Sequence, residues 1–249
     1  MDVFFKKSLP YFLVFLVWST VYFLHFQPTY LIPSPIDAIQ SLGDGIQNRT
    51  LLIGAGKSLM RILIGYFISL VIGIPLGLAV GRSRFLDDTL GSFMGTLQVI
   101  PSICWLPFAI LWFGLSEWAI QFVIIMGGFL PIAIATIGGI QNIPSLYVRA
   151  ARTMGIRRFD LYRRVVLPAA LPSILTGMKL GWSFAWRSLM AGELLFVSVG
   201  LGQLLQTGRE LNDMSQVIAV MFMIMLIGWS FDHLFGFLQH RLRRKWGTA

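Results

Sequence analysis

The sequence predicts an all-α integral membrane protein with about six transmembrane helices and both termini in the cytoplasm. Of the 249 residues, 56% are hydrophobic and only 12% are charged, and the mean hydropathy is +0.74. Such a chain has too little polar surface for a water-soluble domain. Long apolar runs recur along it without the alternation typical of strands. A helix needs about 20 apolar residues to cross a hydrocarbon layer of about 30 Å, so only a few crossings fit.

Six apolar runs account for the predicted crossings: 9–26, 58–80, 89–114, 117–141, 166–192 and 214–238. The first run follows Lys6 and Lys7 but lacks a small-residue cleavage site, so we interpret it as a retained crossing and not as a signal peptide. Proline removes a backbone hydrogen bond and tends to kink a helix. Kinks are therefore expected at four prolines inside the spans: Pro75, Pro101, Pro107 and Pro131.

Two features lie between the first two runs. Ser34, Pro35 and Asp37 form a helix start, with Ser34 as N-cap, and predict a short helix outside the membrane or lying on it. The stretch "GAGKS", residues 54–58, resembles the end of a phosphate-binding loop, but Leu51 stands where that loop needs its first Gly. We therefore expect no ATP site here, and place Ser58 near the lipid headgroups.

The placement of basic residues predicts the topology. The net charge is +9, and 14 of the 20 Lys and Arg residues fall in loops on one side of the predicted bundle: Lys6, Lys7, Arg82, Arg84, Arg149, Arg152, Arg157, Arg158, Arg163, Arg164, Arg241, Arg243, Arg244 and Lys245. The positive-inside rule places these loops in the cytoplasm. The charge therefore indicates orientation in a lipid bilayer, and no nucleic-acid partner is expected. The single cysteine, Cys104, excludes a disulfide within the chain.

The longest polar segment, 142–165, is cytoplasmic in this topology and predicts two short helices. Ser145 is expected to cap the first helix and Gly155 to end it in the left-handed conformation. A second, basic helix follows, and Pro168 opens the fifth crossing. Paired alanines on an exposed helix, with arginines beside them, suit close docking of another protein. A plain amphipathic helix on the membrane surface is the alternative.

The spacing in this segment resembles the EAA loop of ABC-importer permeases: Glu-Ala-Ala, three residues, Gly, nine residues, Ile, one residue, Leu-Pro. The matching residues are Ala150, Ala151, Gly155, Val165, Leu167 and Pro168, whereas Arg149 replaces the Glu. The stretches "LIPSP", "GIPLGLAVGRSR", "ILWFG", "VVLPAALPSILTG" and "SFAWRSLMAGEL" are also similar to permeases of nitrate, sulfonate, taurine and bicarbonate importers. The resemblance covers nearly the whole chain.

The resemblance implies a single permease domain over residues 1–249 with a type I ABC importer permease fold, in the plasma (inner) membrane of a bacterium. It implies that two copies of the permease form a homodimer. It also implies two separate ATPase subunits that bind ATP and Mg, and an extracytoplasmic solute-binding protein. No cofactor is expected on this chain itself. The implied ATPase-coupling residues are Arg149, Ala150, Ala151, Arg152, Gly155, Arg157, Arg158, Leu167 and Pro168.

Polar residues inside spans are functional candidates because charges in a membrane are costly. On the fifth crossing, four of them share one helix face and are expected to line a path for an anion: Thr176, Lys179, Ser183 and Arg187. Alternatively, Lys179 snorkels to the inner interface and Arg187 to the outer one, or Arg187 pairs with Glu193. Glu193 and Gly202 are candidates for an outer gate.

Two other classes of protein compete with the importer hypothesis. An intramembrane enzyme would need a nucleophile and base, a carboxylate pair or a His cluster, but the three histidines are scattered and no catalytic or metal site is expected. A channel or secondary transporter would work without an ATPase and would leave the Ala-Ala to Leu-Pro loop unexplained. The substrate stays open: a sulfonate, nitrate or bicarbonate is favoured, and a neutral small molecule is not excluded.

Overall fold

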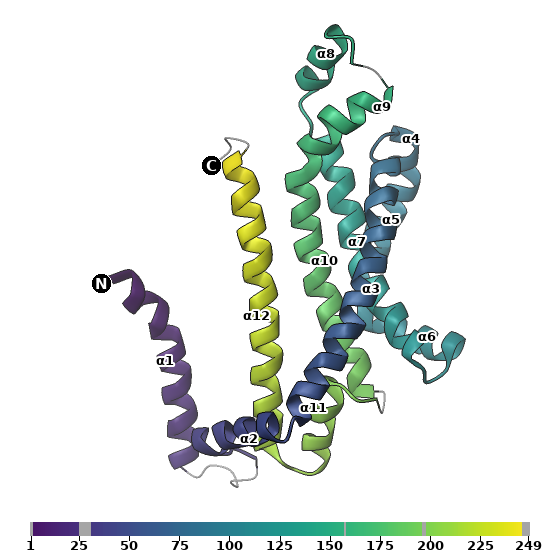
Figure 1. Cartoon of the computed structure of the whole chain (residues 1–249). Coiled ribbons are helices and arrows are strands. Elements are labelled where there is room, and N and C mark those ends of the chain that lie inside the picture. Colours follow the sequence, from purple (N-terminus) through teal and green to yellow (C-terminus); the bar gives the residue numbers. More distant parts are fainter. Residues whose placement is uncertain (1, 25–30, 157, 196–197, 246–249) are drawn as a thin grey trace. The chain divides into compact units, whose positions relative to one another are not determined.

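The computed structural model describes residues 2–24, 31–156, 158–195 and 198–245, and all regular secondary structure in these ranges is helical (Figure 1). The all-α class predicted from the sequence is therefore confirmed. The chain forms two compact units, Met1–Ser58 with Glu193–Leu226 and Leu59–Gly192 with Ile227–Ala249.

The first unit contains three whole helices and parts of three longer ones: α1 (Asp2–Phe23), α2 (Pro35–Gln47) and α11 (Leu201–Glu210), with the start of α3 (Thr50–Val80), the end of α10 (Leu167–Leu195) and the start of α12 (Met214–Lys245). The start of α2 is as predicted. The Ser34 hydroxyl accepts a hydrogen bond of 3.0 Å from the Asp37 backbone N–H, and the Asp37 carboxylate accepts one of 3.1 Å from the Ser34 N–H. This reciprocal capping box satisfies two backbone donors and fixes where α2 begins.

The second unit holds the remaining helices, most of α10, and the ends of α3 and α12. Its elements in chain order are α4 (Arg84–Leu86), the π-turn η1 (Asp87–Gly91), α5 (Ser92–Val99), the 3₁₀ turn η2 (Ser102–Trp105), α6 (Leu106–Phe113), α7 (Glu117–Gln141), α8 (Ser145–Thr153), α9 (Arg158–Leu161), the π-turn η3 (Tyr162–Val166) and α10 as far as Gly192. Figure 1 shows α8 and α9 beyond the ends of α7 and α10. Helix α8 therefore lies outside the helices that are apolar enough to cross a membrane.

In the described ranges, four helices are long and apolar enough to cross a membrane: Thr50–Val80, Glu117–Gln141, Phe159–Leu195 and Met214–Arg241. A fifth crossing is added if the bent pair of helices Arg84–Val99 and Ser102–Phe113 forms one span. The apolar part of α1, Phe12–Phe23, is shorter. The multi-pass character is confirmed, with fewer full-length helices than the six apolar runs suggested.

The predicted crossing over 89–114 is not one continuous helix, because the chain bends there by 98°, a sharper change than the expected proline kink. The break lies at Pro101, which separates α5 from η2. Proline disfavours the helical conformation of the residue before it, and Ile100 is extended, with φ −71° and ψ 119°. Pro107 lies in the first turn of α6, where a missing N–H is harmless, so it does not kink that helix.

Helix α7 forms the centre of the second unit, and glycines on its neighbours allow close packing against it. A Cβ on Gly77 of α3 would lie 2.6 Å from the Ala133 carbonyl oxygen, and one on Gly181 of α10 would lie 2.8 Å from the Gly128 carbonyl oxygen. Small residues at such contacts let membrane helices approach backbone to backbone. The same helix contributes Leu130 and Ala133 to a buried apolar cluster with Val80 of α3.

Candidate functional site

Helix α8 is the centre of the predicted coupling loop, and its two ends are well defined. Its N-cap is Pro144, with Ser145 as the first helical residue and no side-chain cap, so the predicted Ser145 cap is wrong. At the other end Gly155 has φ +82°, as predicted. The Gly155 N–H donates to the Arg152 carbonyl oxygen (3.1 Å) and the Ile156 N–H to the Ala151 carbonyl oxygen (3.0 Å). This pattern is a Schellman motif, which glycine at that position favours.

The inner face of α8 packs on the chain's own apolar cluster. Ala151 is only 2% exposed and lies in a buried cluster with Leu161 and Val166, against which Val148 and Ile156 also pack. The expected exposed pair of alanines is therefore wrong for Ala151, and only Ala150 is exposed. The buried alanine holds α8 against η3 and the residues before it, because its small side chain lets the helix lie close to that cluster.

The outer face of α8 exposes apolar side chains in a part of the unit that lies beyond the apolar spans. Leu146 and Tyr147 are more than half exposed, and Met154 at the end of the helix is 72% exposed. Arg149 and Arg152 are exposed as well. An exposed apolar patch with a basic rim is typical of a protein interaction surface.

The basic segment after Gly155 differs in form from the predicted second helix. Arg157 lies outside the described residues, as does the side chain of Arg158. From Phe159 the chain runs as one helix of 37 residues through η3 into α10, so Pro168 lies inside a continuous helix and does not open it. Arg152 and Tyr162 line a cavity of about 650 Å³ under α8.

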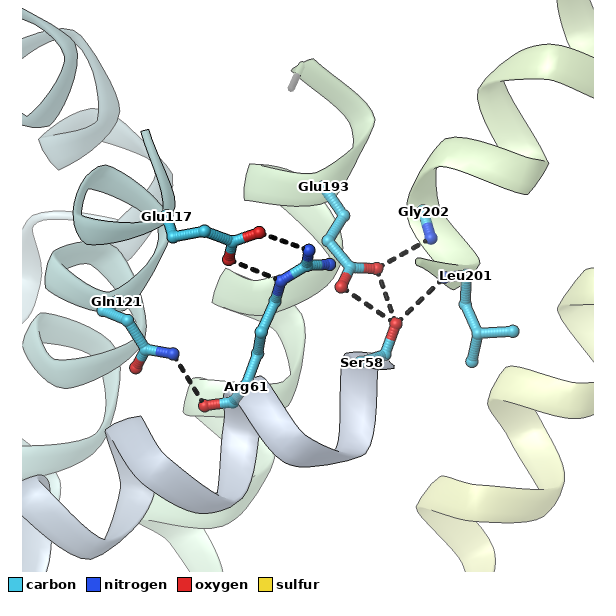
Figure 2. Close-up of polar contacts among 7 residues, drawn as sticks. All are labelled: Ser58, Arg61, Glu117, Gln121, Glu193, Leu201 and Gly202. Carbon is cyan, nitrogen blue, oxygen red and sulfur yellow. Dashed lines mark hydrogen bonds and ion pairs between the residues drawn. The ribbon is translucent and has the colours of Figure 1, made fainter. Parts of the chain in front are cut away.

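A second polar site lies in the first unit, where Glu193 is fully buried (Figure 2). The Ser58 hydroxyl lies 2.7 and 2.9 Å from the two oxygens of its carboxylate, and the Gly202 N–H donates to one of them over 2.9 Å. The Leu201 N–H in turn donates to the Ser58 oxygen over 2.9 Å. Ser58 has no exposed surface, so its hydroxyl faces the protein interior and makes no contact with lipid headgroups.

This arrangement places a carboxylate at the N-terminus of α11, where unpaired N–H groups and the helix dipole favour a negative charge. The two predicted gate residues, Glu193 and Gly202, are thus in direct contact. Glycine is needed on both sides of the carboxylate. A Cβ on Gly200 would lie 2.5 Å from it, and one on Gly202 would collide with the Glu193 Cβ. The close approach therefore depends on the sequence Gly-Leu-Gly.

A third polar cluster, in the second unit, ties α3 to the start of α7 (Figure 2). The Arg61 guanidinium donates to both oxygens of Glu117, over 2.7 Å from Nε and 2.5 Å from Nη2. The Arg61 side chain is 9% exposed and that of Glu117 57%, which places the pair at the edge of the apolar region. Gln121, one turn further along α7, donates to the Arg61 carbonyl oxygen. Bidentate pairing of this kind fixes the orientation of both side chains.

Comparison with known proteins decides the family. Residues 69–247 match the family described as "Binding-protein-dependent transport system inner membrane component", which covers more than half of the chain. The chain belongs to this family of ABC importer permeases. It is therefore a transport subunit of a multi-pass, inner-membrane family, and the identification from the EAA-like loop is confirmed.

Two relatives and one solved structure illustrate the likeness of this permease to known ones. It is 30% identical to the taurine transport system permease protein TauC of Escherichia coli, over 91% of this chain and 84% of TauC. It is 34% identical to the nitrate import permease protein NrtB of Leptolyngbya laminosa, over 74% of this chain and 66% of NrtB. A chain of the MetNI methionine ABC transporter has the same fold, with a TM-score of 0.64, 23% identity, and coverage of 79% of this chain and 95% of that one.

The polar face of α10 in this permease contains the predicted path residues. Lys179 forms an ion pair of 2.7 Å with Asp232 of α12, and the Arg187 guanidinium lies 5.2 Å from the centre of the Phe184 ring. The hydroxyls of Thr176 and Ser183 donate to carbonyl oxygens one turn back on their own helix. Their role as a translocation path stays a prediction.

Sequence reasoning missed three of these polar residues as functional candidates. Ser58 was placed near the headgroups because Gly56 and Lys57 before it suggested a flexible entry to a membrane helix. Asp232 has its partner, Lys179 of α10, 53 residues away in the chain. Only Glu117 had a useful signal in the sequence, because it is an acidic residue at the first position of an apolar helix, where the helix dipole stabilises a negative charge.

Proposed function

We propose that this chain is the membrane-spanning subunit of an ATP-driven importer and couples to a separate ATPase through α8. In this proposal residues 1–249 form one permease domain, two copies of which make the path, and an extracytoplasmic binding protein delivers the solute. ATP and Mg are bound by the ATPase subunits and not by this chain. The chain itself catalyses no reaction.

The observation that carries the proposal is the construction of α8. Its inner face is fixed by the buried Ala151, and its C-terminus is fixed by the Gly155 turn, so the helix is rigidly joined to the start of α10. Its outer face exposes Leu146, Tyr147 and Met154 outside the apolar spans. A rigid helix with an exposed apolar face can transmit the closure of an ATPase pair to the membrane helices, as in other rigid-body motions.

A small anion is the proposed solute, with a sulfonate or nitrate favoured. The names of two relatives support this choice: one is named for taurine, which is a sulfonate, and another for nitrate. Lys179 and Arg187 lie on one face of α10, and while Lys179 is paired with Asp232, Arg187 is a cationic group in a span, which suits an anionic solute. Bicarbonate fits the same chemistry.

The decisive experiment is a pull-down of the tagged full-length chain from its native membrane in mild detergent, with the retained proteins quantified by mass spectrometry. We expect an ATPase at one copy per permease chain, and the co-recovered binding protein would then be used to identify the solute. If no ATPase is recovered even after cross-linking with nucleotide trapped, the importer proposal fails, and a channel or secondary transporter becomes the better hypothesis.

A further inference from the structure

A second cavity, of about 700 Å³, lies at the end of α3 that is predicted to face the cytoplasm. Its apolar part is formed by Leu78 and Ala79 of α3 and by Leu167 of α10. These residues belong to the ends of two membrane-spanning helices. The cavity therefore lies where the hydrocarbon region of the membrane meets the headgroups.

Basic and aromatic side chains complete the cavity. Arg82 and Arg163 line it, together with Phe159, which is 76% exposed, and Tyr162. The Arg82 guanidinium lies 5.3 Å from the centre of the Tyr162 ring, a cation–π contact that holds it beside the cavity. Within the part of the chain that the structure describes, neither Arg82 nor Arg163 forms an ion pair with a carboxylate. The neighbouring Arg164, in contrast, lies 3.6 Å from Asp160.

We propose that this cavity binds the headgroup of an anionic phospholipid of the inner leaflet. Arg82 and Arg163 would contact the phosphate, because guanidinium groups donate to phosphate oxygens in fixed geometry. Leu78, Ala79 and Leu167 would contact the first carbons of the acyl chains. Basic pockets between membrane helices on the cytoplasmic side bind such headgroups in general. The proposal does not depend on the ATPase.

A lipid is favoured over a protein partner because of the apolar part of the cavity. Leu78 and Leu167 come from spans, and an ATPase outside the membrane would not reach them without entering the headgroup region. Phe159 is exposed at the mouth of the cavity, and aromatic side chains are stable at the level of the headgroups. Free phosphate would use the two arginines and leave the apolar contacts unused.

The test uses the full-length chain purified in mild detergent and offered equal amounts of phosphatidylglycerol and phosphatidylcholine, with bound lipid counted by native mass spectrometry. We expect the wild-type chain to retain phosphatidylglycerol preferentially. The double variant Arg82→Gln/Arg163→Gln should bind it about twenty-five-fold more weakly, at roughly fivefold for each arginine. The matched control Arg84→Gln/Arg164→Gln removes the same charge from neighbouring positions that do not line the cavity, and should bind as the wild type does.

Three outcomes would overturn the proposal. Equal loss in both double variants would indicate a general charge effect. Displacement of the lipid by inorganic phosphate at equal concentration would indicate a free-anion site. Displacement of the lipid by the ATPase subunits would indicate that the arginines belong to a protein interface. Should the double variant not fold, Arg163→Gln alone is measured, with Arg164→Gln as its control and the same fivefold expectation.

Discussion

Replacing Ala151 with tryptophan is expected to abolish ATP-driven uptake while the chain still inserts into the membrane. Ala151 is packed against Leu161 and Val166, and the indole is far larger than the buried methyl group that it replaces. Overpacking of a core costs about 1–3 kcal/mol, which is enough to move a short helix off its support. Because α8 would then lose its fixed position, we expect at least about a tenfold fall in uptake and in ATPase recovery, since 1.4 kcal/mol corresponds to tenfold.

Two further tryptophan variants separate packing from docking. Ala150→Trp adds the same bulk on the exposed side of α8, so thermal stability in detergent should stay unchanged while ATPase recovery falls. Gly95→Trp is the control for expression and insertion, because a Cβ there meets no atom within 4 Å. Wild-type uptake by the Ala151→Trp chain would count heavily against α8 as the coupling helix.

Replacing Glu193 with alanine is expected to have the second-largest effect, on the first unit. The change leaves the Ser58 hydroxyl and the Gly202 N–H without their carboxylate acceptor in a fully buried position. An unpaired buried donor costs about 1–3 kcal/mol. We therefore expect a lower melting temperature of the detergent-purified chain. Uptake should also fall, because the predicted outer gate consists of Glu193 and Gly202.

The control for this change is Glu210→Ala, which removes a carboxylate of the same size from the exposed end of α11. It should leave the melting temperature and uptake near those of the wild type. Glu193→Gln keeps one oxygen acceptor and should lie between the alanine variant and the wild type. An unchanged melting temperature for Glu193→Ala would mean that the contacts of the carboxylate contribute nothing to the stability of this unit.

Two local signals in the sequence predicted local structure correctly, whereas the Ser145 cap and the helix start at Pro168 were wrong. Ser34, Pro35 and Asp37 predicted the start of α2, and their side chains form the expected capping box. Gly155 was predicted to end α8, and it does so with a positive φ. In both cases the deciding interactions lie within a few residues, so the pattern of residue types is sufficient.

What the sequence could not predict depends on contacts between distant segments. Ser58 meets Glu193 across 135 positions, and nothing near Ser58 indicates a buried carboxylate. Ala151 is buried because it packs against Leu161 and Val166. These residues come close to α8 only because the chain turns back after Gly155. Pro101 was expected to kink a helix, but whether a proline kinks or breaks a span depends on the packing around it.

A cross-link from α8 to an ATPase tests the central claim most directly. The single cysteine, Cys104, is exposed and is first replaced by serine. A new cysteine is then placed at Tyr147, on the exposed face of α8, or at Leu211, which follows α11 and is 70% exposed. With a short thiol-to-amine cross-linker in native membranes, the account predicts an adduct of Tyr147→Cys with an ATPase and none for Leu211→Cys. Absence of the adduct at Tyr147, or equal adducts at both positions, would contradict it.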